Sequence, residues 1–188
     1  MKKLVFVAFL ALLSGVSIGQ NRYFTKNGKI YFDCTTPASP EKIEGTNEKV
    51  TCIIDASTGA MEFMLAMKAF AFERALMQEH FNENYVESDT YPKCTFKGTI
   101  TDMSSVDLKK DGTYNVKVKG DMTLHGVTKT VEATGTVTVK GGAITAAKSN
   151  FKITLADFKV TIPSVVKDKV AADAKISVDL TLLPYVKS

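Results

Sequence analysis

The feature that most constrains this chain is a two-residue alternation of apolar and polar side chains, which returns in segment after segment. In residues 28–36, "GKIYFDCTT", the side chains of Ile30, Phe32 and Cys34 share one phase. Seven further segments alternate in the same way: 48–56, 59–70, 93–103, 113–124, 129–140, 142–155 and 174–183. A period of two places alternate side chains on opposite faces of a β-strand. With turn sequences such as "STG", "KKDGT" and "KGGA" between several segments, the pattern predicts an antiparallel β-sandwich or β-barrel.

One segment breaks the alternation. Residues 70–81, "FAFERALMQEHF", carry apolar side chains such as Leu76 at helical spacing and contain no Gly or Pro. Asn82 and Asn84 follow, and asparagine tolerates the left-handed conformation that ends many helices. The sequence therefore predicts a helix over 70–81 that ends in a turn, and that covers one opening of the barrel. A second, shorter helical turn is expected within 163–173.

The N-terminus has the features of an export signal. Within residues 1–19, Lys2 and Lys3 precede the apolar run "LVFVAFLALL", and "SGVSIG" then supplies small residues for cleavage after Gly19. The apolar run is short for a membrane-spanning helix, and no cysteine near the cleavage site suggests a lipid anchor. We therefore expect a signal peptide and one soluble domain over 20–188, exported to the periplasm or, alternatively, outside the cell.

The charge balance gives little support to nucleic-acid binding. The whole chain has 24 Lys and Arg against 20 Asp and Glu, a formal net charge of +4. Two of these lysines lie in the expected signal peptide, which leaves +2 for the rest. The remaining lysines are scattered, whereas a nucleic-acid interface needs a basic patch or stripe.

Three cysteines, Cys34, Cys52 and Cys94, lie in the apolar phase of strand-like segments. They are expected to be small buried hydrophobic residues. The odd number leaves at least one thiol unpaired, but an exported chain can form disulfides, so a Cys34–Cys52 bridge between neighbouring strands is the alternative.

The chain has only two histidines, His80 and His125. A metal or catalytic site needs converging His, Cys or carboxylate groups, and Glu79 or Asp121 could supply a third ligand. However, the chain has no HExxH, no G-x-S-x-G and no Gly-rich phosphate loop. We expect His80, with the asparagines after it, to secure the helix end, and His125 with Gly126 to hold a turn. A metal-dependent enzyme that uses the two histidines is therefore the least favoured function.

The apolar phase could also line a ligand cavity. An eight-stranded barrel is close to the size at which side chains either fill the interior or leave room for one ligand. Met61, Met64, Met67 and Met77 lie within seventeen residues, and flexible thioethers suit an adaptable cavity. The candidate lining residues are Phe32, Ile54, Phe63, Leu65, Met67, Phe70, Phe72, Leu76, Phe81, Phe96 and Ile100. Alternation alone does not separate a hollow barrel from a filled one.

Three stretches resemble a known family. "FAFERALMQEHFNENYVESDTYPKCTFKG", "GDMTLHGVTKTV" and "LADFKVTIPSVVKDKVAADAKISVDL" are similar to the YceI-like proteins, exported bacterial lipid binders with a lipocalin-like barrel, and the resemblance runs from about residue 22 to 184. It implies an antiparallel barrel of about eight strands with one short helix over its opening. It also implies an apolar tunnel that holds a polyisoprenoid chain, such as a quinone tail.

The resemblance transfers no catalytic residue, and it implies no cofactor apart from a bound isoprenoid lipid. The expected function is to bind such a lipid for storage or transport in the cell envelope, with transient membrane contact. A homodimer is also possible. Some relatives are discussed in stress or adhesion settings, so an exported interaction protein with a filled barrel is the alternative.

Overall fold

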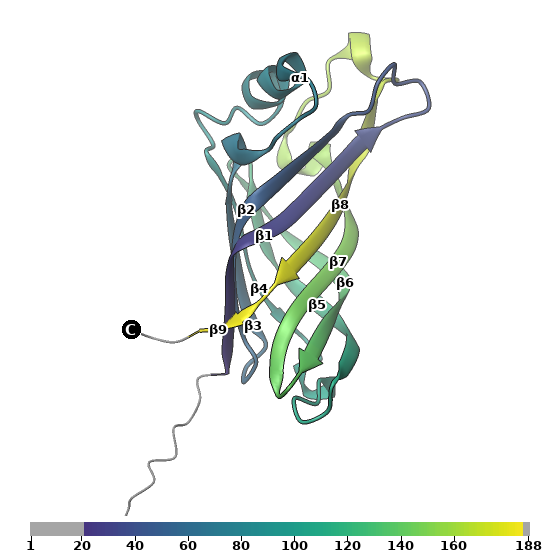
Figure 1. The fold of residues 1–188 in the computed structure, drawn as a ribbon. Coiled ribbons are helices and arrows are strands. Elements are labelled where there is room, and N and C mark those ends of the chain that lie inside the picture. Colours follow the sequence, from purple (N-terminus) through teal and green to yellow (C-terminus); the bar gives the residue numbers. More distant parts are fainter. Residues whose placement is uncertain (1–20, 186–188) are drawn as a thin grey trace, which may run out of the picture.

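Eight long strands follow one another along the chain and close into an antiparallel barrel (Figure 1). The computed structural model describes residues 21–185; the expected signal peptide, residues 1–19, lies outside them. The strands are β1 (Arg22–Thr35), β2 (Glu44–Asp55), β3 (Ala60–Ala66), β4 (Lys93–Ile100), β5 (Gly112–Leu124), β6 (Val127–Lys140), β7 (Ala143–Thr154) and β8 (Val170–Thr181). Each strand pairs with its neighbours in sequence, and β1 pairs with both β2 and β8. The prediction of an antiparallel barrel is confirmed.

The closing strand β1 is irregular at Gly28. The register of β1 against β2 shifts on both sides of this residue, as expected for a β-bulge. A Cβ atom at Gly28 would lie 2.5 Å from Cδ2 of Leu180 on β8. The absence of a side chain therefore lets β1 come close to β8 and complete the barrel. A two-residue strand, β9 (Leu183–Pro184), extends the sheet beside the first residues of β1.

The helical segment is shorter and later than predicted. Helix α1 covers Ala75–His80, and a π-helical turn, η2, continues it over Phe81–Tyr85. The predicted start at residue 70 is wrong because the backbone around Ala71 bonds to β2: the amide of each of Thr46 and Ala71 donates to the carbonyl of the other, at 3.0 and 2.8 Å. A backbone bonded to a strand is extended and cannot begin a helix.

Helix α1 ends within one residue of the predicted end, but the turn expected after it is not left-handed. Asn82 and Asn84 belong instead to the π-helical turn η2. The Asn82 side chain explains this continuation, because its Nδ2 donates to the carbonyl of Gln78 at 2.8 Å, within the helical segment. The left-handed residue comes later, at Glu87, with φ of 45°.

The remaining helical pieces are single turns. They are η1 (Met67–Ala69), η3 (Met103–Ser105), η4 (Leu155–Phe158) and η5 (Ser164–Val166). The last of these is the helical turn expected within 163–173, although β8 already begins at Val170. In the described part of the chain, no helix is both long and apolar enough to span a bilayer.

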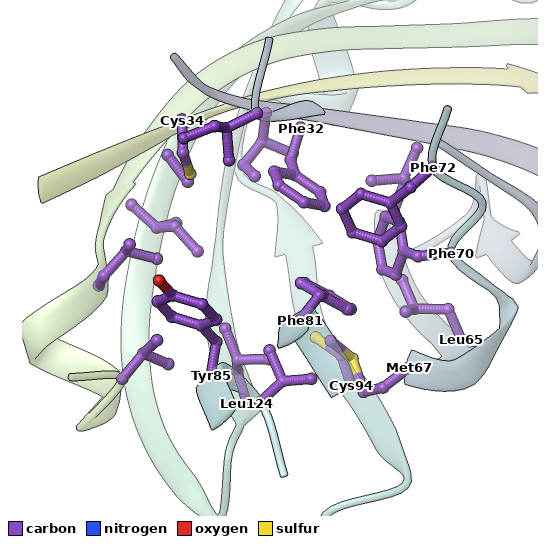
Figure 2. Close-up of a pocket in the computed structure, with 18 of the residues that line it drawn as sticks. Phe32, Cys34, Leu65, Met67, Phe70, Phe72, Phe81, Tyr85, Cys94 and Leu124 are labelled. Atoms are coloured by element: carbon purple, nitrogen blue, oxygen red, sulfur yellow. The ribbon is translucent and has the colours of Figure 1, made fainter. Parts of the chain in front are cut away.

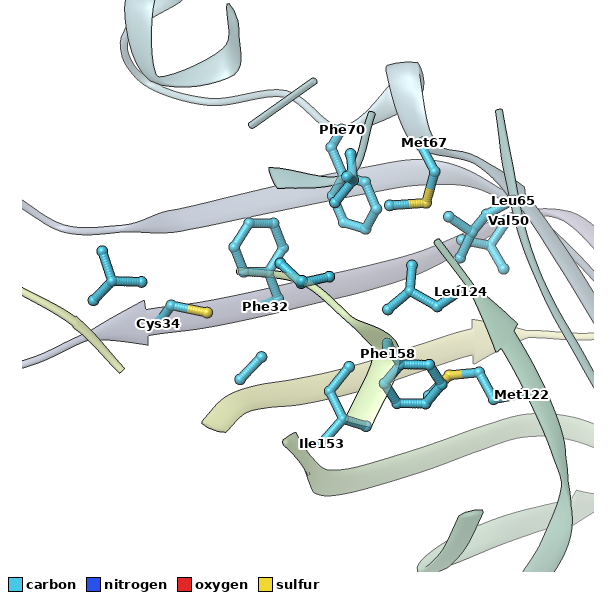
Figure 3. Close-up of a cluster of buried hydrophobic side chains, with 14 residues drawn as sticks. Phe32, Cys34, Val50, Leu65, Met67, Phe70, Met122, Leu124, Ile153 and Phe158 are labelled. Carbon is cyan, nitrogen blue, oxygen red and sulfur yellow. The ribbon is translucent and has the colours of Figure 1, made fainter. Parts of the chain in front are cut away.

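The interior of the barrel divides into two hydrophobic clusters. We call the first the mouth cluster; it lies on the side of α1 and includes Phe32, Leu65, Phe70, Met122 and Phe158 (Figure 3). We call the second the base cluster; it fills the opposite end with residues that include Tyr23, Cys52, Ile54, Ile100, Val137, Ile144 and Leu180. The base cluster is a packed core, whereas the mouth cluster surrounds an open space.

Candidate functional site

The space inside the mouth cluster is an apolar cavity of about 470 Å³ (Figure 2). Inward-facing side chains of β1 and of β3 to β8 form its wall, and residues of α1, η2 and η5 flank its mouth. The volume falls in the range of about 300–1,000 Å³ that is usual for small-molecule sites. The barrel is therefore filled at its base and hollow toward its mouth.

Most of the residues proposed from the sequence meet at this cavity. Nine of the eleven line it: Phe32, Phe63, Leu65, Met67, Phe70, Phe72, Leu76, Phe81 and Phe96. Ile54 and Ile100 do not, and this part of the prediction is corrected. They are 0% and 3% exposed and belong to the base cluster. Both residues face inward as the alternation predicts, but alternation reports the face of a strand and not the depth along the barrel.

The lining residues contributed by the second half of the chain were not predicted. These include Met122, Leu124, Phe151, Ile153, Ala174 and Ile176, from β5, β7 and β8. Their signal was present, because each lies in the apolar phase of an alternating segment that predicts a strand. In a closed barrel every strand contributes to the interior, so the apolar phase of all eight segments points to interior residues, of which those on β1 and β3 to β8 line the cavity.

Four phenylalanine rings hold the short helix over the mouth. The Phe32 ring stacks on Phe81 of η2, with centroids 5.3 Å apart and an interplanar angle of 16°. It also meets Phe70 and Phe72 edge-on, at 5.4 and 5.7 Å. Because the segment around Ala71 is extended rather than helical, these two rings project from the same side of it. Such ring pairs add about 0.5–1.5 kcal/mol each beyond the area they bury.

The cavity offers no anchor for a charged group below its mouth. In residues 21–185 the buried polar residues are Thr25, Asn47 and Ser88, and none of them lines the cavity. The charged lining residues lie at the mouth, where Nε of Arg74 is 2.6 Å from Oε2 of Glu41 and both side chains are partly exposed. An ion or a strongly polar group would lose its hydration inside without compensation. The interior therefore suits the apolar part of a ligand.

The three cysteines are free thiols, so the alternative of a Cys34–Cys52 disulfide is wrong. Cys52 pairs with Thr25 in the β1–β2 register, and Cys34 lies nine residues farther along β1, about 30 Å away at 3.3 Å per residue. A disulfide needs Cα atoms within about 7 Å. Burial raises the pKa of all three thiols to about 12, with the nearby Asp33 carboxylate adding to the effect at Cys34. Cys34 and Cys94 line the cavity.

The histidines occupy different places. His125 and Gly126 form the two-residue turn between β5 and β6, with φ of 50° and 71°, and this left-handed pair matches the twist of a hairpin. Nδ1 of His125 donates to the carbonyl of Phe158 at 3.1 Å, and its ring meets Tyr91 edge-on. His80 is exposed at the end of α1, beside the cavity mouth. Within the described residues, no three His, Cys, Asp or Glu side chains form a group that could hold a metal.

The chain is similar to proteins that share this fold. The model of the YceI-like domain family matches residues 24–182. A polyisoprenoid binding domain from Saccharophagus degradans superimposes with a TM-score of 0.71 at 11% identity, covering 88% of this chain and 99% of that one. BcnA from Burkholderia cenocepacia superimposes with 0.62 at 17% identity, covering 82% and 94%. The YCEI protein from Campylobacter jejuni gives 0.59 at 14% identity, covering 81% and 90%. No functionally curated protein matches the chain.

Proposed function

Because this chain belongs to the YceI-like domain family, we propose that its cavity binds the apolar chain of a lipid, namely a polyisoprenoid or the tail of an isoprenoid quinone. The observation that carries the proposal is the apolar lumen whose charged lining residues lie only at the mouth. The Saccharophagus degradans protein of the same fold is described as a polyisoprenoid binding domain, which supports this class of ligand.

The energetics are adequate for retention of the lipid. Burial of apolar carbon contributes about 0.8 kcal/mol per CH₂ group, so a chain of about twenty carbons gains roughly 16 kcal/mol. Association and chain ordering cost about 4–15 kcal/mol. The difference is sufficient for the lipid to stay bound through purification when the ordering cost is toward the low end of that range.

The proposed role is storage or transport of this lipid in the cell envelope, after export to the periplasm. Leu76 of α1 and Val165 of η5 are 60% and 81% exposed, and both segments lie at the open end of the barrel (Figure 1). Exposed aliphatic side chains beside the mouth would contact the bilayer during loading or release. This contact would be transient, since two side chains bury too little area for stable membrane binding.

Lipid extraction tests the proposal directly. The protein is purified from its native host without detergent, extracted with organic solvent, and the extract is analysed by mass spectrometry. We expect about one isoprenoid lipid per chain. If the extract contains no stoichiometric lipid and the delipidated protein takes up no added isoprenoid, the proposal is wrong, and the exported interaction protein becomes the better hypothesis.

A further inference from the structure

The cavity ends on a floor made by the side chains that both line it and contact the base cluster: Met61, Phe63, Phe96, Val118 and Val178. We propose that this floor sets the length of the apolar chain that the barrel accepts, an inference that rests on the lipid-binding function proposed above. A chain that reaches the floor gains nothing from further carbons, because those carbons remain at the mouth. The floor residues would then determine specificity for chain length.

The two rings lie between the cavity and the packed base. Phe63 on β3 and Phe96 on β4 are direct partners in the strand register, and their rings meet edge-on with centroids 6.1 Å apart. Both line the cavity, and both also pack against the base cluster. Ile54 and Ile100, beyond them, are buried and do not line the cavity. Met61, one inward position closer to the base than Phe63 on β3, still lines the cavity and belongs to the base cluster. The open space therefore ends at the layer formed by the two rings together with Met61, Val118 and Val178.

A pair of glycines fixes the position of the Phe96 ring. Gly98 and Gly120 face each other across β4 and β5. A Cβ atom on either would lie 2.6 or 2.7 Å from Cζ of Phe96, which is closer than atoms in contact can approach. The ring therefore lies against the bare backbone of these glycines.

The depth of the lumen gives the expected length of the chain. On β5 the lining extends from Val118 to Leu124, a rise of about 20 Å along the strand and about 15 Å along the barrel axis at a tilt near 40°. An extended chain advances about 1.2 Å per bond, as extended polypeptide does, so about 12 bonds, or roughly three isoprene units, fit inside. Further units would gain contacts only beneath the helix at the mouth.

Two substitutions at the floor should move the limit in opposite directions. Ala133 on β6 is the register partner of Val118 and lines the cavity; Ala133→Leu adds bulk above the floor and should shorten the accepted chain. Phe96→Leu removes the ring and should lengthen it. The matched control is Thr134→Leu, which adds bulk at the next residue of β6, on the exposed outer face.

The test measures dissociation constants of delipidated protein for prenyl alcohols of two to six isoprene units. For the unsubstituted protein we expect affinity to rise at least tenfold per unit and to level off at about three to four units. The levelling-off should come about one unit earlier in Ala133→Leu, about one unit later in Phe96→Leu, and at the same length in Thr134→Leu. Circular dichroism establishes whether each variant is folded. If Phe96→Leu does not fold, the result for Ala133→Leu is sufficient to test whether the floor sets the accepted chain length.

The outcomes separate the two proposals. If prenyl alcohols bind but the levelling-off is unchanged in a folded Ala133→Leu protein, the floor does not set chain length and the inference is wrong. If no prenyl alcohol binds the unsubstituted protein, the proposed lipid-binding function itself fails.

Discussion

At the scale of single residues, the reactivity of the three thiols distinguishes the cavity from the packed core. Cys34 and Cys94 line the cavity, whereas Cys52 is sealed in the base cluster. Because burial raises their pKa from 9.0 to about 12, the neutral thiol persists in the folded protein over a pH range in which an unfolded thiol ionises. Only the thiolate reacts readily with alkylating reagents.

We therefore predict slow alkylation of the folded, delipidated protein by iodoacetamide at pH 8, and fast alkylation of three thiols after unfolding. Raising the pH from 8 to 10 should increase the alkylation rate of the unfolded chain much more than that of the folded protein. A bound prenyl alcohol should further protect Cys34 and Cys94, with no added effect at Cys52. Mass spectrometry of labelled peptides measures each site; equal protection of all three would argue that the ligand does not occupy this cavity.

Leu65 and Met64 provide a second test at the residue scale, because these neighbours on β3 face opposite sides of the barrel wall. Leu65 lines the cavity and is buried, whereas Met64 is exposed. In Leu65→Asp a carboxylate enters an apolar lumen that holds no partner for it, so we expect the lipid to be lost. Met64→Asp is the control and should keep its lipid. The readout is lipid per chain by mass spectrometry; retention by a folded Leu65→Asp protein would contradict the placement of the ligand.

At the scale of elements, the helix that covers the mouth depends on its contacts rather than on its own length. Helix α1 has six residues, none of them buried, and isolated helices this short are unstable in water. Phe81 provides the main attachment of the segment, with ring contacts to Phe32, Phe70 and Phe72.

We predict that Phe81→Ala speeds lipid exchange by at least tenfold, because the loss of three ring contacts removes about 1.5–4.5 kcal/mol of attachment. The eight strands do not depend on this ring, so circular dichroism should still report the barrel. Exchange is measured with a fluorescent prenyl probe chased by unlabelled alcohol. Glu83→Ala, at an exposed position of the same turn, serves as the control. An unchanged exchange rate in Phe81→Ala would mean that the helix does not gate the cavity.

Elements also mark the limit of what the sequence could predict. All eight strands were found because alternation is a local property of each segment. The first turns of the predicted helix are wrong because the backbone of Ala71 is hydrogen-bonded to that of Thr46, twenty-five residues earlier. The spacing of neighbouring residues cannot predict a hydrogen bond to a residue so distant in the sequence. The same limit applies to the site, where the inward face of Ile54 was predicted correctly but its depth below the floor was not.

At the scale of the whole molecule, the division into a hollow mouth and a packed base predicts that ligand binding and stability can be altered separately. A ligand that binds only the folded state stabilises it, by about 2.7 kcal/mol at one hundred times its dissociation constant. For a chain of this size, about 1 kcal/mol corresponds to roughly 2–4 °C in Tm. Reloading the delipidated protein with a prenyl alcohol at that concentration should therefore raise Tm by about 5–11 °C.

Ile54→Val tests the independence of the base. Ile54 is fully buried in the base cluster and does not line the cavity, so removal of one methylene should cost about 0.5–1.5 kcal/mol. Tm should fall by a similar amount with and without lipid, because distant and independent effects add. Scanning calorimetry gives the four Tm values needed, those of the unsubstituted protein and of Ile54→Val, each delipidated and reloaded. The contrary result is a lipid-induced stabilisation of Ile54→Val, converted from its rise in Tm, that differs from that of the unsubstituted protein by more than about 0.5 kcal/mol. In that case the base is coupled to the cavity, and the packed end of the barrel adjusts to the bound chain.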